Sequence, residues 1–188
     1  MGVILAGKPF TQEKTQEILD QFFRDGFVHI PNVLTTAEVR ALINKTDEIM
    51  DDPDCALSMQ SSAGGSAYVQ LWEDKNTGKP VPFILRNCIE SDDIFRQMLV
   101  REPIFSLAEA IVGKDSKFCG QNVIRNLQGL SIDKWHCDNK ESYFPLPDEI
   151  KRHDSRIHMP VMWFTVQLPL TDVESLEYGP TRYIPGSH

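Results

Sequence analysis

The chain of 188 residues is long enough for one domain with its own core, and its 41% hydrophobic and 24% charged residues are typical of a globular protein. The formal net charge of -8 disfavours nucleic acid and anionic membrane surfaces as partners, because either would meet like charge. No apolar run reaches the length of a transmembrane helix. We therefore expect a small-molecule substrate, and the composition leaves the oligomeric state open.

The cysteines indicate the redox environment. Cys55, Cys88, Cys119 and Cys137 are scattered without a C-x-x-C pair, so a zinc ribbon or a redox dithiol has no support. The apolar residues 1–7 are too few for a secretory signal. We expect reduced thiols and a cytoplasmic protein.

The first part of the chain predicts helices. Thr11 to Phe23 has apolar residues at helical spacing, and Phe27 to Ile30 is typical of a short strand. The pattern Thr35-x-x-Glu38 predicts a capping box at the start of a helix that continues to Met50.

A polar stretch and two short helices are expected next. Ser58 to Pro82 is rich in Ser, Gly and Lys and predicts a long excursion or a ragged hairpin, which we expect to border a substrate pocket. Asp92 to Val100 and Pro103 to Val112 predict two helices in series, with Gly113 ending the second.

After Gly113 the sequence favours strands. Asn139 to Pro160 is too polar for a core and predicts a loop that shapes the pocket. The expected strands are Lys117 to Arg125, Ile132 to Cys137, Val161 to Leu168 and Thr181 to Ile184. The fold class is therefore α+β: one domain, residues 1–188, with a mainly helical part (1–113) packed on the outside of a β-sandwich or barrel (114–188).

The stretch W-H-C-D-N, residues 135–139, contains a candidate metal pair. In a strand, His136 and Asp138 project to the same face, because alternate side chains do. An imidazole and a carboxylate so placed form two corners of the 2-His-1-carboxylate triad of non-haem iron enzymes. The spacing alone is equally compatible with a polar pair at a strand end.

Three further stretches give a resemblance. They are G-F-V-H-I-P-N-V-L-T-T-A-E-V from Gly26, M-W-F-T-V-Q-L-P-L-T-D from Met162, and Y-G-P-T-R-Y-I-P-G-S-H from Tyr178. Together with W-H-C-D-N, the chain resembles the phytanoyl-CoA dioxygenase family of Fe(II)- and 2-oxoglutarate-dependent oxygenases. The resemblance implies helices packed on a double-stranded β-helix, a jelly-roll or cupin-like barrel.

The resemblance also implies the site and the reaction. His136 and Asp138 correspond to iron ligands and catalytic residues, and Trp163 and Val123 to walls of the 2-oxoglutarate pocket; for Val123 a plain core position is equally compatible. The implied cofactors are Fe(II), 2-oxoglutarate and O2, and the implied reaction is hydroxylation of a small organic molecule. Asp138 disfavours halogenation, since halogenating relatives replace this carboxylate with a small residue. The substrate itself is not determined by the fold.

One part of the family pattern is missing. Relatives have a distal iron histidine and then an arginine that pairs with 2-oxoglutarate, both well beyond the P-G-S-H signature. Only about half of a barrel is readable here, so we expect the 188 residues to be part of a longer oxygenase. Within them, His188 is the candidate third metal ligand, although the resemblance gives it a turn position, and Arg182 is a weaker stand-in for the arginine.

Two other classes of protein stay open. The chain could be a non-catalytic barrel that serves as a binding module, which would not form an Fe(II) and 2-oxoglutarate complex. It could also be a cupin-type metal protein, which would bind iron yet leave 2-oxoglutarate unconsumed.

Overall fold

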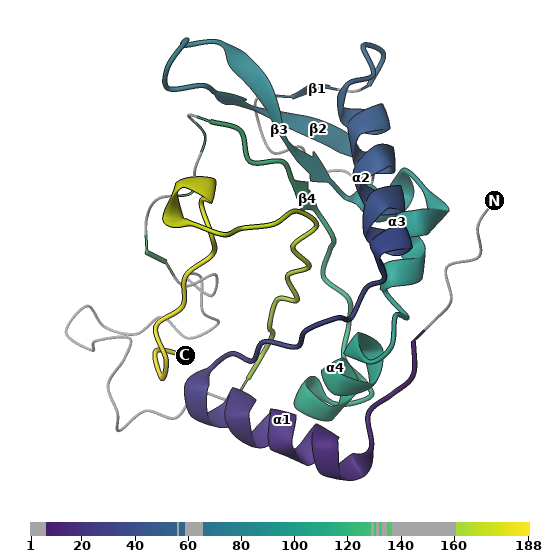
Figure 1. The fold of residues 1–188 in the computed structure, drawn as a ribbon. Helices are drawn as coiled ribbons and strands as arrows, with labels where there is room; N and C mark the ends of the chain where they lie inside the picture. Colours follow the sequence, from purple (N-terminus) through teal and green to yellow (C-terminus); the bar gives the residue numbers. More distant parts are fainter. Residues whose placement is uncertain are drawn as a thin grey trace.

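The structure is a computed structural model that describes residues 7–55, 57–58, 66–128, 130, 132, 135–136 and 161–188. This described part has an α+β fold with a four-stranded sheet and helices beside it (Figure 1). The elements are α1 (Gln12–Asp25), α2 (Thr36–Met50), β1 (Leu57–Ser58), β2 (Tyr68–Glu73), β3 (Pro80–Arg86), the 3-10 helix η1 (Cys88–Glu90), α3 (Asp93–Met98), α4 (Ile104–Val112), β4 (Val123–Ile124) and the 3-10 helix η2 (Leu176–Tyr178).

The first helix, expected over Thr11 to Phe23, is confirmed and runs from Gln12 to Asp25. The hydroxyl of Thr11 accepts a hydrogen bond from the Lys14 N–H at 3.3 Å, which caps the N-terminus of α1. At the other end Gly26 adopts the left-handed conformation with φ +82° and donates its N–H to the Phe22 carbonyl at 2.8 Å. The side chain of Ile18 is buried.

The predicted capping box of α2 is confirmed. The Glu38 N–H donates to the Thr35 hydroxyl at 3.2 Å, and the Thr35 N–H donates to the Glu38 carboxylate at 2.7 Å. The backbone N–H groups of Thr35 and Glu38, which have no partner within the helix, are therefore each hydrogen-bonded to the other residue's side chain. The same helix buries Leu42 and Met50.

The sheet has the order β1-β2-β3-β4, with β1 parallel to β2 and the other pairs antiparallel. β2 and β3 form the hairpin that was one of two expectations for Ser58 to Pro82, but β3 continues beyond this range to Arg86. Two prolines obscured β3 in the sequence. Pro82 is tolerated because it pairs with Leu71 beside the register irregularity that follows Gln70.

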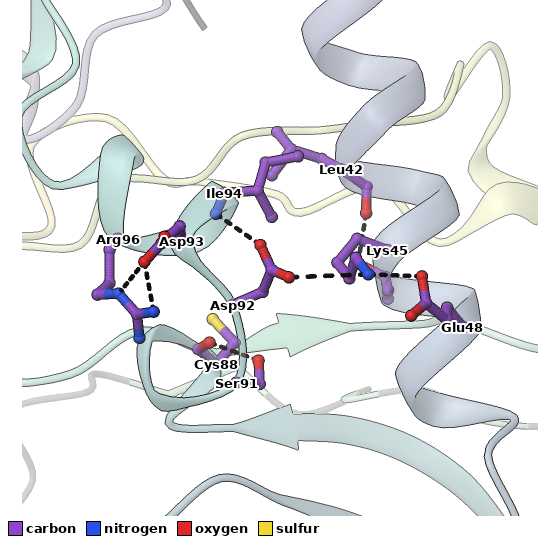
Figure 2. A network of polar contacts seen from close by, with 10 residues as sticks. Leu42, Lys45, Glu48, Cys88, Ser91, Asp92, Asp93, Ile94 and Arg96 are labelled. Carbon is purple, nitrogen blue, oxygen red and sulfur yellow. Dashed lines mark hydrogen bonds and ion pairs between the residues drawn. The ribbon is translucent and has the colours of Figure 1, made fainter. Parts of the chain in front are cut away.

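The main core lies between α2, α3 and the sheet. Its buried residues are Leu42, Met50, Val69, Leu85, Cys88, Phe95 and Met98. Figure 2 shows a polar link between the two helices: the Lys45 ammonium lies 2.5 Å from Glu48 and 3.7 Å from Asp92. Asp92 in turn caps α3 by accepting the Ile94 N–H at 2.9 Å.

The predicted distribution of strands is partly wrong. β1, β2 and β3 precede Gly113, whereas we expected residues 1–113 to be mainly helical and most strands to follow Gly113, and the strand expected at 117–125 is reduced to β4. Residues 27–30 and 161–188 are all described and contain no strand. A strand needs a neighbouring strand to pair with. Residues 161–188 contact α1 through a backbone hydrogen bond from Gly186 to Asp25 and through side chains such as Phe164, whose ring lies 6.0 Å from that of Phe22.

The helices of the described residues include none that is both long enough and apolar enough to cross a membrane.

Candidate functional site

The W-H-C-D-N stretch is partly described. Trp135 and the candidate ligand His136 are both exposed, whereas Asp138 lies outside the described residues, as does the loop 139–160. The exposure of His136 leaves its imidazole accessible from solvent.

The chain that leads to His136 is fixed to the sheet. In β4, Val123 pairs with Leu85 and Ile124 with Ile84 of β3. The next residue, Arg125, donates its backbone N–H to the Phe83 carbonyl at 2.9 Å.

The side chain of Arg125 adds a second attachment. Its guanidinium donates to Asp47 at 3.3 Å and to Asp51 at 2.8 Å, at the C-terminal end of α2. Further along, Leu130 is buried against Phe83 and Ile84. Residues 123–125 and Leu130 are therefore anchored to the fold ahead of the motif.

The two candidate pocket residues lie on different segments. Val123 is half-buried in β4 and packs against the main core, as expected if it is a plain core valine. Trp163 belongs to the segment 161–188 and is 39% exposed. Figure 1 shows this segment running from the neighbourhood of α1 toward β4 and back, and its residues Leu168 and Leu170 pack against the main core.

His188 lies at the C-terminal end of α1. A Cβ placed on Gly26 would be 2.5 Å from the His188 Nδ1 atom, so only a glycine fits there. The neighbouring Gly186 donates its N–H to the Asp25 carbonyl at 2.8 Å. A hydrogen bond from Arg24 lowers the pKa of the Asp25 carboxyl, and the nearby His188 lowers it further. The P-G-S-H turn thus docks on α1, which gives His188 a structural role.

The structure also brings together two parts of the resemblance that are distant in sequence. The guanidinium carbon of Arg182 lies 5.0 Å from the centre of the Trp135 ring, within the range of a cation–π contact. The sequence suggested Arg182 either as a weak stand-in for the missing arginine or as an exposed arginine at a strand end. No periodicity or spacing links Arg182 to Trp135, so the pair was not predictable.

The donor types fit iron. A neutral imidazole and a carboxylate suit Fe(II), and the H-x-D spacing leaves neighbouring coordination positions for other ligands. Among the described residues, to which Asp138 does not belong, no three His, Cys, Asp or Glu side chains gather into a metal-binding group. The identity of the third protein ligand therefore stays a prediction.

The chain was also compared with known proteins. The family model described as phytanoyl-CoA dioxygenase (PhyH) matches residues 22–188. Comparisons with curated proteins and with solved structures gave no match. The matched range covers nearly the whole chain and includes W-H-C-D-N and the docked P-G-S-H turn. The chain therefore belongs to the phytanoyl-CoA dioxygenase family.

Proposed function

We propose that this protein is an Fe(II)- and 2-oxoglutarate-dependent dioxygenase that hydroxylates a small organic molecule. The observation that carries the proposal is the family match over residues 22–188, which contains the H-x-D pair at 136 and 138. The family's small-molecule chemistry is consistent with the net charge of -8, which disfavours polyanionic partners.

In this proposal His136 and Asp138 hold the iron. The imidazole of His136 is exposed, and the chain before it is attached to the fold at Arg125 and Leu130. His188 is the candidate third ligand within the printed sequence, and its contact with Gly26 competes with that role. Trp163 and Val123 are proposed as walls of the 2-oxoglutarate pocket.

When bound, iron and 2-oxoglutarate would supply the chemistry that activates O2 and oxidises a C–H bond. The chain's own contribution is to hold the metal by few ligands, to orient the co-substrate and to keep water from the reacting atoms. The carboxylate of Asp138 occupies the position that a halogenating enzyme leaves open, which favours hydroxylation. We place these residues in one domain, residues 1–188, whose strands belong to a jelly-roll barrel.

An anaerobic titration tests the proposal. Fe(II) added to the full-length protein with 2-oxoglutarate should produce a visible charge-transfer band that neither additive produces alone. His136→Ala and Asp138→Ala should each abolish the band, because each removes a metal ligand. His29→Ala removes an exposed histidine outside the motif and should retain it.

The same titration separates the alternatives. A non-catalytic barrel would give no band in the wild-type protein. A cupin-type metal protein would bind Fe(II) without the band and would not convert 2-oxoglutarate to succinate when O2 is admitted. Either result in the folded wild-type protein would overturn the proposal.

A further inference from the structure

The contact between Arg182 and Trp135 joins the candidate metal motif to the P-G-S-H segment. Trp135 directly precedes His136 in the chain, and Arg182 lies in the segment 178–188. The 5.0 Å distance from the guanidinium carbon to the ring centre places the cation over the indole. The orientation of Trp135 therefore depends on a residue distant in the sequence.

The segment that carries Arg182 is held in place by several contacts. The ring of Tyr183 stacks on Phe27 with centres 5.1 Å apart and planes at 15°. The Tyr183 hydroxyl donates to the Gln167 side chain at 2.9 Å. Gly186 donates its N–H to the Asp25 carbonyl at 2.8 Å. Arg182 is thus attached to a segment that is held by α1, by residue 27 and by residue 167.

Trp135, by contrast, is not held by a core. Its side chain is 60% exposed, whereas Leu130, the last buried residue described before it, is 6% exposed. An exposed indole has few packing contacts to fix its rotamer, so a cation over its face has a large share in orienting it.

We propose that Arg182 is a positioning residue for the metal site: by holding the Trp135 ring, it restricts the backbone at 135–136 and presents the His136 imidazole to the metal. This inference rests on the proposed iron site. In this inference the Arg182 guanidinium contacts the Trp135 indole. The sequence-based alternative is that Arg182 binds the carboxylate of 2-oxoglutarate. The positioning role affects Fe(II) binding without 2-oxoglutarate, whereas the carboxylate-binding role affects 2-oxoglutarate binding, so experiments can separate them.

The test is a double-mutant cycle read by Fe(II) affinity of the full-length protein without 2-oxoglutarate. Arg182→Ala and Trp135→Ala should each weaken Fe(II) binding by about two- to five-fold, the factor that corresponds to an exposed cation–π contact. The double variant should be no weaker than either single variant, because both remove the same contact. Arg182→Lys keeps the cation and should restore part of the affinity. Arg40→Ala, which removes an exposed arginine of α2, is the control and should have no effect.

A second readout does not need iron. In the metal-free protein with labelled histidines, Arg182→Ala should change the NMR signals of the His136 ring and leave those of His29 unchanged. Unchanged His136 signals, additive effects in the cycle, or an Arg182→Ala effect limited to 2-oxoglutarate affinity would each overturn the inference. A wild-type protein that binds no Fe(II) would instead refute the proposed function, and the NMR experiment would still decide whether Arg182 positions His136.

Discussion

The guanidinium of Arg101 lies 3.1 Å from the carboxylate of Glu38, and the two side chains are only 6% and 5% exposed. Arg101 also donates to the Val33 carbonyl at 2.8 Å, while Glu38 closes the capping box with Thr35. The pair therefore ties the start of α2 to the chain just before α4. Removing one member of a buried ion pair leaves the other charge without compensation, which is far more costly than losing an exposed pair.

Arg101→Ala should lower the free energy of unfolding by about 3–5 kcal/mol, because the Glu38 carboxylate then stays buried without its cation. Urea denaturation followed by circular dichroism measures this. The control is Lys14→Ala, which removes a pair with Glu17 whose side chains are 54% and 58% exposed, and which should cost less than about 1 kcal/mol. Equal losses in the two variants would show that the buried pair has no special role.

Gly26→Ala should destabilise the protein in two ways. The left-handed conformation at φ +82° costs an alanine about 1–2 kcal/mol. In addition the new Cβ would overlap the Cβ, Cγ and Nδ1 atoms of His188, so the docked turn must move.

Gly78→Ala is the matched control for this prediction. Gly78 has φ +67° with no atom within 4 Å of an added Cβ, so its substitution measures the backbone cost alone. Gly26→Ala should lose more stability than Gly78→Ala, and the excess should shrink when His188→Ala is combined with it. If the two glycine variants unfold at the same urea concentration, the turn does not depend on this contact.

The Cys88 thiol should be unreactive in the folded protein. Burial raises the pKa of this thiol from its ordinary value of 9.0 to about 12, so its thiolate fraction near pH 8 falls by roughly a thousand-fold. Cys119 is exposed and should react quickly. Labelling with an alkylating reagent followed by peptide mass spectrometry checks the order, and comparable rates for the two thiols in the native protein would contradict it.

The same shift makes stability depend on pH. Because the folded pKa of Cys88 lies above the unfolded value of 9.0, its contribution is complete below about pH 9 and declines as the pH rises toward 12. Unfolding experiments between pH 8 and pH 10.5 should show this decline in the wild-type protein and a smaller one in Cys88→Ala. Parallel curves for both proteins would exclude the thiol as the cause.

The sequence predicted the helices well because their ends have local signals. Thr11 and Thr35 cap helices by bonds to residues three positions away, and Gly26 closes α1 within one turn. The strands depend on distant partners. Pro82 lies opposite the register irregularity of β2 and outside the residues of β3 that pair with β4, and no short stretch of sequence encodes either feature.

In the candidate site, too, features with a local sequence signal could be predicted and features that depend on distant residues could not. His136 was predicted from the H-x-D spacing and the resemblance, and the family match supports the iron chemistry. The contact of Arg182 with Trp135 joins segments 47 residues apart, and that of His188 with Gly26 joins opposite ends of the chain. Such pairs are fixed by tertiary packing, so neither periodicity nor composition indicated them.

The most direct test of the iron site is the amount of Fe(II) that the full-length protein binds in anaerobic equilibrium dialysis. The account predicts about one iron per chain in the wild-type protein and in His29→Ala, and a loss of binding in His136→Ala and in Asp138→Ala. His188→Ala, measured in parallel, decides whether that histidine is the third ligand. Iron binding in His136→Ala equal to that of the wild-type protein would contradict the central claim.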